Sequence, residues 1–342
     1  MHWQIPEHWT SITAIDAHTG GEPLRIFAPA KGHPPIPGET ILAKRRYALE
    51  KYDFLRTATL WEPRGHADMY GCIITEPVTE DGHFGVLFTH NEGYSSMCGH
   101  GIIAVTKVVL ETGLIDLPAG LDEIRIDTPA GRVTAFPHRD NSVVKAVSFH
   151  NVPSFVYVLD QITEVPGIGR LKYDIAFGGA FYAFVDANEA GVEMNAGGFR
   201  RLIETGTQIK NTLMQERTIE HPFEEDLGFL YGVIFTGPPA DKRNHSRNVC
   251  IFADGEVDRS PTGTGVSART AIHFAKGDLK INQSFTVESI LGTTFTGEAV
   301  KELEFGPYRA VVPKVTGSAH ICGINNLLID PDDSLKHGFI LR

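Results

Sequence analysis

The sequence predicts an α+β protein built from two similar halves. Residues 83–113 align without a gap with residues 247–277, at an offset of 164 positions, the difference between 98 and 262. In each copy, a short run of β-branched and aromatic residues precedes a polar turn, small residues and an apolar segment of helical length. Duplication of one domain, with strands around a helix, would leave such a pattern.

The two copies of the repeat match most closely at the starts of the two predicted helices. Cys98 stands in the first copy where Thr262 stands in the second. A weaker match relates YGCI (70–73) to YGVI (231–234), at an offset of 161 positions. Identical residues at the main offset are Ser96 and Ser260, Gly99 and Gly263, Gly101 and Gly265, Ala104 and Ala268, and Gly113 and Gly277.

The repeat sets the expected domain boundaries. A new strand-like run, SFHNVPSFVYV, begins near residue 150. We therefore expect a first α+β half over 1–150 and a second over 151–315, with 316–342 able to pack back on the first. Low-complexity linkers are absent from the sequence, so the halves should be closely joined.

Each element of the repeat has a local reason. The runs at 85–89 and 249–252 have strand composition. Gly113 and Gly277 suit the positions just after the two helices, and Ser260 with Pro261 suits an N-cap and first turn for the second. The first helix should be buried on nearly all sides because its apolar residues cover most of its circumference: Ile102, Ile103, Val105, Val108, Val109 and Leu110.

Composition favours small-molecule chemistry. The chain has 342 residues, with 31 Lys and Arg against 42 Asp and Glu, giving a net charge of −11. An acidic surface without basic runs repels nucleic acid, so no nucleic-acid partner is expected. The sequence has neither a basic and apolar leader pattern nor an apolar run long enough to span a bilayer. We expect a cytoplasmic protein with no membrane partner.

The four cysteines, like the 15 histidines, show no metal-site or disulfide spacing. The sequence contains neither CxxC nor HExxH, so no metal and no disulfide framework are expected. Cys72, Cys250 and Cys322 lie in strand-like apolar runs and are interpreted as structural thiols.

The two helix starts are predicted anion sites. Cys98-Gly99-His100-Gly101 and Thr262-Gly263-Thr264-Gly265 would carry unpaired N–H groups and the positive end of a helix dipole. That setting favours a thiolate, so we expect the pKa of Cys98 to lie below its free value and Cys98 to be a candidate base. On its residues alone, Cys98 also fits a small core residue.

Two other sequence motifs would indicate different functions, namely dinucleotide binding and hydrolysis by a nucleophilic serine. GHGIIA (99–104) and GTGVSA (263–268) fit GxGxxA after a strand, which is typical of dinucleotide binding. No clear acidic ribose ligand stands at a strand end about 20 residues later, and the following segments indicate antiparallel strands, so a nicotinamide cofactor is not expected. A GxSxG nucleophile motif is also absent.

Several motifs together resemble the proline racemase family, which also contains hydroxyproline 2-epimerases and trans-3-hydroxy-L-proline dehydratases. The resemblance spans nearly the whole chain. It implies a diaminopimelate-epimerase-like fold of two similar domains, each a mostly antiparallel sheet around a central helix, with the active site in the cleft between them. The motifs are DAHTGGEPLRI (16–26), EPRGHADMYG (62–71), SSMCGHGIIA (95–104), FGGAFYAFVDA (177–187) and DRSPTGTGVSA (258–268).

The pair Cys98 and Thr262 departs from the racemase pattern. In racemases and epimerases of the family, two cysteines face opposite sides of the substrate α-carbon. Here the second position is Thr262. A threonine hydroxyl is too weak an acid for two-way proton exchange near pH 7, whereas elimination needs a base on one face only. The Cys/Thr pair resembles the trans-3-hydroxy-L-proline dehydratases.

The resemblance also assigns expected roles to further residues. Asp258 matches an aspartate beside the substrate ring nitrogen. His18, Glu22, Arg25, Arg64 and His66 lie in family-like motifs that suit either a site or fold-maintaining turns. Backbone N–H groups that can hold the substrate carboxylate belong to Gly99, His100, Gly263 and Thr264.

The predicted function is dehydration of trans-3-hydroxy-L-proline to Δ1-pyrroline-2-carboxylate. In this substrate the 3-hydroxyl lies on the same ring face as the α-hydrogen. Cys98 could therefore remove the α-hydrogen and then protonate the departing hydroxyl. Thr262 would either donate a hydrogen bond to the substrate hydroxyl or fill space. No cofactor is expected, the partner is a small imino acid, and a homodimer is expected on base rates alone. The alternatives are a hydroxyproline 2-epimerase or proline racemase, and an inactive imino-acid-binding protein.

Overall fold

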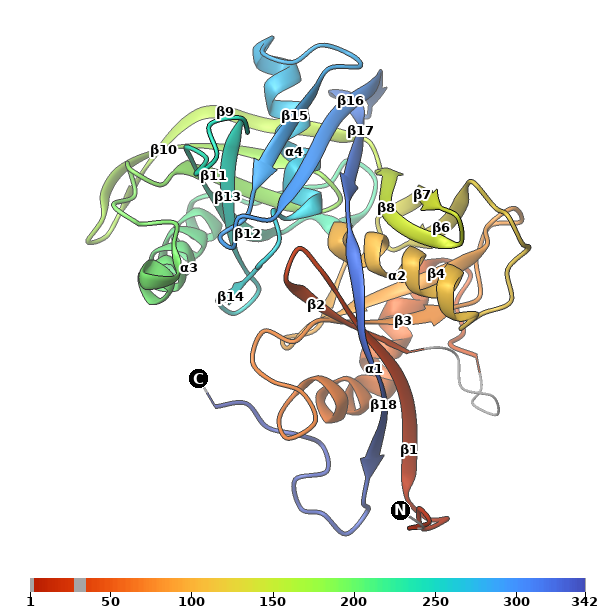
Figure 1. Cartoon of the computed structure of the whole chain (residues 1–342). Helices are drawn as coiled ribbons and strands as arrows, with labels where there is room; N and C mark the ends of the chain where they lie inside the picture. Colours follow the sequence, from red (N-terminus) through yellow and green to blue (C-terminus); the bar gives the residue numbers. More distant parts are fainter. Residues whose placement is uncertain (1–2, 28–34, 342) are drawn as a thin grey trace.

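The computed structural model describes residues 3–27 and 35–341 as two lobes of strands and helices (Figure 1). The first lobe begins with a long strand at the N-terminus and carries two helices. Its elements are β1 (Thr10–Thr19), β2 (Glu22–Phe27), α1 (Ile41–Leu60), β3 (Gly71–Thr75), β4 (Phe84–Thr89), β5 (Tyr94–Ser95), α2 (Gly99–Thr112), β6 (Ile124–Thr128), β7 (Gly131–Asp140) and β8 (Val143–His150).

The second lobe follows the same order of elements. It also contains two short 3-10 helices, η1 (Ala196–Gly198) and η2 (Glu225–Leu227). Its other elements are β9 (Ser154–Val165), β10 (Gly169–Phe177), β11 (Phe181–Asp186), α3 (Phe199–Glu216), β12 (Leu230–Gly237), β13 (Ser246–Phe252), β14 (Glu256–Val257), α4 (Gly263–Lys276), β15 (Ser284–Glu288), β16 (Thr294–Phe305) and β17 (Tyr308–Gly317). The last strand, β18 (Ala319–Ile329), lies beside β1 in the first lobe.

Strand pairing repeats between the lobes. In the first, β2–β3 and β4–β6 are parallel pairs, whereas β1–β2, β3–β4, β6–β7 and β7–β8 are antiparallel. In the second, β11–β12 and β13–β15 are parallel, whereas β10–β11, β12–β13, β15–β16 and β16–β17 are antiparallel. The aligned repeat in the sequence therefore corresponds to a repeat in strand pairing.

The two lobes are also joined through their strands. β18 returns to the first lobe and pairs antiparallel with β1 along its whole length. β17 pairs with both β8 and β9, at the point where the chain passes from one lobe to the other. Hydrogen bonds between strands therefore connect the lobes into one continuous sheet system.

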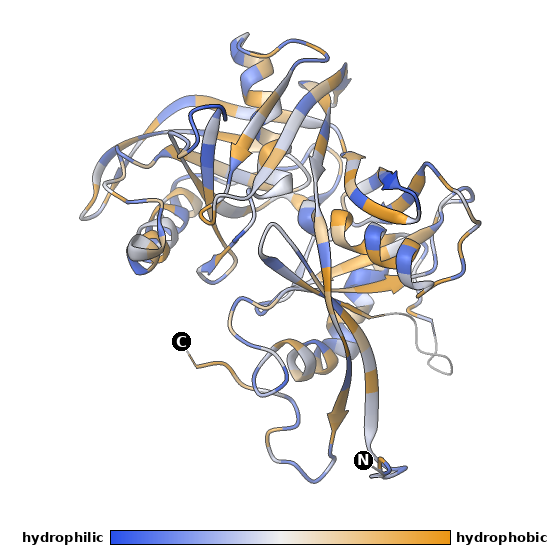
Figure 2. Cartoon of the chain, in the orientation of Figure 1, coloured by the Kyte–Doolittle hydropathy of each residue, from blue (hydrophilic) through white to orange (hydrophobic). Residues whose placement is uncertain are grey.

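Helices α2 and α4 lie at the centre of the packing. α2 contacts β1, β7, β8 and β18, and α4 contacts β9, β10, β16 and β17. Every residue from Gly99 to Val109 is buried, which confirms the predicted burial of this helix around its circumference. Figure 2 shows apolar residues along the strands next to α2. Both helices therefore have fixed positions and directions.

The predicted helix ends are correct, and one predicted start is wrong. Gly113 and Gly277 adopt left-handed backbone conformations, with φ of 65° and 82°, directly after α2 and α4. Ser260 is not the N-cap of α4, because Thr262 takes that position with φ of 66° and the helix begins at Gly263. The Ser260 hydroxyl instead accepts a hydrogen bond from the Thr262 N–H at 3.1 Å.

Membrane-spanning helices and metal-binding clusters are both absent from the described part of the chain. Among residues 3–27 and 35–341, no helix has the length and apolar character needed to cross a membrane. The same residues contain no group of three or more His, Cys, Asp or Glu side chains placed to hold a metal ion.

Candidate active site

The N-termini of α2 and α4 meet at a small internal cavity. Gly99 and Gly263 are packed so closely that a Cβ added to Gly99 would lie 2.5 Å from the Gly263 Cα. The cavity has a volume of about 20 Å³. Each of the seven predicted site residues lines it: Cys98, Gly99, His100, Asp258, Thr262, Gly263 and Thr264.

Cys98 is the N-cap of α2. Its Sγ accepts a hydrogen bond from the Gly101 N–H at 3.2 Å and lies 3.1 Å from His100 Nδ1. Burial raises the pKa of Cys98 well above its ordinary value, and the Gly101 N–H offsets this only in part. The prediction of a lowered pKa is wrong for this closed site because loss of water around the thiolate outweighs the helix start.

His100 lies beside the thiol as a neutral acceptor. Burial lowers the pKa of His100 to about 3, so the imidazole is uncharged near pH 7. A neutral ring nitrogen 3.1 Å from Cys98 Sγ is able to accept a hydrogen bond from the thiol. The Thr19 hydroxyl donates to the His100 carbonyl at 2.9 Å, which fixes the backbone here. The hydrogen bond therefore orients the thiol, and a ring with so low a pKa leaves the proton on sulfur.

Thr262 differs from Cys98 in both backbone and side chain. Its φ of 66° is unusual for a β-branched residue, and its side chain makes no cap hydrogen bond. Its hydroxyl is buried and makes no hydrogen bond of ordinary length and angle among the described residues, although it lies close enough to the Asp258 carboxyl to lower the pKa of that group. The second helix start therefore offers an unpaired hydroxyl to the cavity where the first offers a thiol.

The two helix starts provide backbone donors that converge on the cavity. The first intrahelical hydrogen bonds run from Ile102 N–H to Cys98 and from Val266 N–H to Thr262. The N–H groups of the preceding helical residues are therefore available to an anion. These residues are Gly99, His100, Gly263 and Thr264.

Asp258 supplies a carboxyl group to the same cavity. One of its oxygens accepts a hydrogen bond from the Ser260 N–H at 2.7 Å. Burial raises the pKa of Asp258, and the bond from Ser260 opposes that shift. A buried carboxylate of this kind is a suitable partner for a cationic ring nitrogen.

Glu22 ties the lobes together close to the cavity without lining it. Its Oε2 accepts from the Arg259 N–H at 2.7 Å and lies 3.2 Å from Arg259 Nε. The Arg259 guanidinium also donates to the Asp68 carbonyl at 3.0 Å. Glu22 is fully buried, and burial raises its pKa well above the ordinary value. Of the residues left open by sequence, Glu22 is the one whose charge contributes to the raised pKa of Cys98.

The remaining open candidates form fold contacts. Arg25 makes a double hydrogen bond to Asp16, at 2.9 and 2.8 Å. Arg64 donates to the Lys336 carbonyl. The rings of His18 and His320 pack 5.2 Å apart, and His66 Nδ1 lies 2.6 Å from the Ala67 carbonyl. Arg25, Arg64, His18 and His66 are outside the cavity lining.

Sequence reasoning missed an aromatic wall around the cavity. Tyr70, Tyr182, Tyr231 and Phe252 line it, together with Cys250, which is buried on β13. The repeat of YGCI and YGVI was a signal for two of the tyrosines, because these segments flank the aligned helix starts in both copies. Nothing in the local sequence distinguishes Cys250 from an ordinary core thiol.

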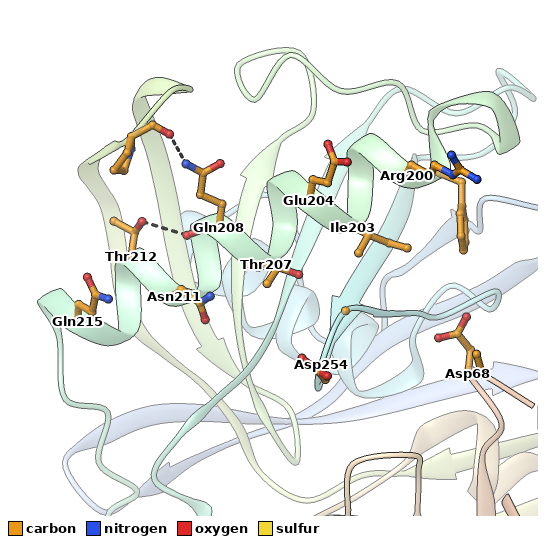
Figure 3. Close-up of a pocket in the computed structure, with 14 residues that line it drawn as sticks. Asp68, Arg200, Ile203, Glu204, Thr207, Gln208, Asn211, Thr212, Gln215 and Asp254 are labelled. Atoms are coloured by element: carbon orange, nitrogen blue, oxygen red, sulfur yellow. Dashed lines mark hydrogen bonds between the residues drawn. The ribbon is translucent and has the colours of Figure 1, made fainter. Parts of the chain in front are cut away.

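A second hollow lies along α3 and shares none of these lining residues (Figure 3). It has a volume of about 950 Å³ and is lined by one side of α3, with Asp68 and Asp254 across from the helix. Thr212 donates to the Gln208 carbonyl at 3.0 Å within the helix. This hollow is an open surface groove, whereas the cavity at the helix starts is enclosed by buried residues.

Comparison with known proteins places the whole chain in one family. The family model described as proline racemase matches residues 14–340. A Colwellia psychrerythraea protein named trans-3-hydroxy-L-proline dehydratase is 49% identical over 336 residues, covering 98% of this chain and 94% of the relative. A Bacillus cereus protein of the same name is 48% identical, covering 96% and 98%.

A solved structure agrees with the architecture. The hydroxyproline epimerase from Agrobacterium vitis, crystallised with trans-4-hydroxy-L-proline, superposes with a TM-score of 0.91 at 29% identity, covering 98% of this chain and 96% of that one. The fold is therefore that of solved structures of this group. The match of the family model over nearly the full length, together with these relatives, shows that the chain belongs to the proline racemase family.

Proposed function

We propose that this protein dehydrates trans-3-hydroxy-L-proline to Δ1-pyrroline-2-carboxylate. One observation carries the proposal: the two equivalent helix starts present a cysteine, Cys98, and an unpaired threonine hydroxyl, Thr262, to one cavity. A single thiol supports chemistry on one face of a substrate. The curated relatives at 48–49% identity bear the name of this activity, which agrees with the residue pair.

The proposed architecture follows the strand repeat. The first domain covers 1–150 and the second 151–315, each a mostly antiparallel sheet around a central helix, α2 or α4. The segment 316–342 belongs with the first domain, supported by the pairing of β18 with β1. The active site then lies in the cleft between the domains. Its volume of about 20 Å³ holds a group the size of one water molecule, so substrate entry requires the walls to separate.

The substrate is held by its carboxylate and its ring nitrogen. The carboxylate accepts hydrogen bonds from the N–H groups of Gly99, His100, Gly263 and Thr264 at the positive ends of both helices. Charge that spreads into the carboxylate during deprotonation is stabilised by the same donors. Asp258 pairs with the ring nitrogen and keeps it protonated.

Cys98 performs the proton transfer. The Cys98 thiolate removes the α-hydrogen of the substrate as a general base. The electron pair forms the Cα–C3 double bond, and the C3–O bond breaks. The proton now on Cys98 passes to the departing oxygen on the same ring face, which gives water and restores the thiolate. The resulting enamine tautomerises to the imine.

A hydroxyproline 2-epimerase is the second candidate, because the Agrobacterium vitis epimerase has the same fold. Epimerisation needs an acid on the face of Thr262, and a hydroxyl that keeps its proton cannot exchange it in both directions near pH 7. An inactive imino-acid-binding protein is the third. The dehydratase gives the imine, the epimerase gives the 2-epimer, and the inactive protein gives no product.

The test uses purified protein and trapping of the imine with o-aminobenzaldehyde. Trans-3-hydroxy-L-proline should give the trapped imine, whereas trans-4-hydroxy-L-proline and L-proline, followed by polarimetry, should keep their optical rotation. A change in rotation with the latter two substrates and no imine from the first would support an epimerase. Binding of substrate without either change would support an inactive protein.

A further inference from the structure

Three buried tyrosines surround the cavity, and one of them has an unused hydroxyl. The Tyr70 hydroxyl lies 2.6 Å from Ser95 Oγ, and the Tyr182 hydroxyl lies 2.7 Å from Thr264 Oγ1. The Tyr231 hydroxyl is buried and makes no hydrogen bond of ordinary length and angle among the described residues, although the Tyr70 hydroxyl is close enough to lower its pKa. Buried hydroxyls are paired in most proteins, so an unpaired one beside a cavity indicates a partner supplied by a ligand.

The internal repeat explains why Tyr231 lacks a partner. Tyr70 and Tyr231 stand at equivalent places in YGCI and YGVI, each directly before or within an inner strand. Ser95, which pairs with Tyr70, corresponds at the main offset to Arg259 in the second copy. The Arg259 guanidinium is occupied by Glu22 and the Asp68 carbonyl. The second copy therefore keeps the tyrosine and lacks the hydroxyl that would satisfy it.

Ring contacts place Tyr231 in the cluster that extends to Cys98. The His100 ring, beside Cys98 Sγ, packs at 4.9 Å against Tyr70. Tyr70 and Tyr231 both pack on Phe252, at 6.2 and 5.5 Å between ring centroids. The substrate hydroxyl that leaves lies on the ring face of Cys98, whereas Thr262 lies on the other helix start.

We propose that Tyr231 donates a hydrogen bond to the 3-hydroxyl oxygen of the substrate and stabilises that oxygen as the C3–O bond breaks. This inference rests on the proposed function. The carboxylate, the ring nitrogen and the α-hydrogen already have partners in the helix starts, Asp258 and Cys98, and the 3-hydroxyl is the polar group that remains.

The environment of Tyr231 suits a donor that keeps its proton. Burial raises the pKa of Tyr231 well above its ordinary value, and the neighbouring Tyr70 hydroxyl opposes this shift only in part. The phenol therefore stays neutral through the reaction, and the proton that completes the water molecule comes from Cys98. A hydrogen bond to an oxygen that gains negative charge is stronger in the transition state than in the substrate.

The test compares Tyr231→Phe with Tyr94→Phe. Both changes remove a buried hydroxyl without a partner among the described residues, but Tyr94 lies on β5 outside the cavity lining. Tyr231→Phe should lower kcat/KM for trans-3-hydroxy-L-proline by about 100-fold or more, as expected for loss of one donor to a developing anion. Tyr94→Phe should retain wild-type kcat/KM.

A second readout separates a hydrogen bond to the hydroxyl from general damage to the site. Pyrrole-2-carboxylate is planar at the α-carbon and has no 3-hydroxyl, so its Kd, measured by calorimetry, should be the same for Tyr231→Phe and wild type. Wild-type kcat/KM in Tyr231→Phe, or equal losses in turnover and in pyrrole-2-carboxylate binding, would overturn the inference. Absence of imine formation by the wild-type enzyme would overturn the proposed function itself, and this inference with it.

Discussion

Gly99 and Gly263 are in backbone contact across the two halves of the molecule. A Cβ on Gly99 would lie 2.5 Å from the Gly263 Cα, and a Cβ on Gly263 would lie 2.7 Å from the Gly99 Cα. No other residue type fits at either place without moving a helix. The contact sets the positions of Cys98 and Thr262, which precede these glycines and face the same cavity.

Gly99→Ala should therefore inactivate the enzyme by moving the helix starts apart. A shift of about 1 Å in reacting groups costs about 100-fold in rate, so kcat should fall at least that far. Gly93→Ala is the matched control, because a Cβ at Gly93 would meet nothing within 4 Å. Steady-state kinetics of both variants check this. Wild-type kcat in Gly99→Ala would show that the helix contact is not needed.

Cys98→Ser should abolish dehydration, because the hydroxyl of serine cannot replace the thiolate as a base near pH 7. The expected loss in kcat is about 100-fold to 10,000-fold, the range for a general base. Cys322→Ser is the control, since Cys322 is an exposed free thiol outside the cavity. Imine trapping measures both variants. Near wild-type turnover in Cys98→Ser would show that another group removes the α-proton.

Thr262→Cys should add a weak epimerase activity. A thiol at this position supplies an acid to the second face, and cysteine lacks the β-branching that is strained at φ of 66°. Conversion of trans-4-hydroxy-L-proline to its 2-epimer, followed by chiral chromatography, measures the gain. Thr262→Ser keeps the hydroxyl and should gain nothing. Failure of a correctly folded Thr262→Cys to epimerise would show that position 262 does not reach the α-carbon.

His273 should make the protein less stable in acid. Burial, with the charge of Arg269 nearby, lowers the pKa of His273 to about 3, whereas the unfolded chain titrates near 6.5. Between those values the unfolded state binds more protons, so the free energy of unfolding rises with pH by about 1.4 kcal/mol per pH unit from this residue. Urea unfolding measures this between pH 4 and 6. The increase of the free energy of unfolding with pH should be smaller in His273→Asn than in wild type by about 1.4 kcal/mol per pH unit. Equal slopes would contradict a neutral, partly buried His273 in the folded protein.

The sequence predicted the elements that lie within one copy of the repeat. Strands β4 and β13, helices α2 and α4, and both glycine ends follow from local pattern, and the seven predicted site residues line one cavity. Helices α1 and α3 lie outside the aligned repeat and were not predicted. The pairing of β18 with β1 joins segments about 300 residues apart in sequence, and local residue patterns do not specify such a partner.

The features of the site that could not be predicted from the sequence depend on which residues surround each group in the folded protein. The raised pKa of Cys98 depends on the residues that close the cavity, whereas the helix start alone predicts the opposite direction. The buried hydroxyls of Thr262 and Tyr231, which make no hydrogen bond of ordinary geometry among the described residues, depend on how the side chains pack in three dimensions. The homodimer and the cytoplasmic location stay predictions.

The central claim is that proton transfer occurs on one face of the substrate. It is tested most directly by incubating the wild-type enzyme with trans-4-hydroxy-L-proline in D2O and separating the products by chiral chromatography, with mass detection of deuterium. The account predicts that all recovered amino acid keeps the L configuration at the α-carbon, with or without deuterium. Appearance of the deuterated 2-epimer would show that Thr262 does not prevent exchange on the second face, and would contradict the account.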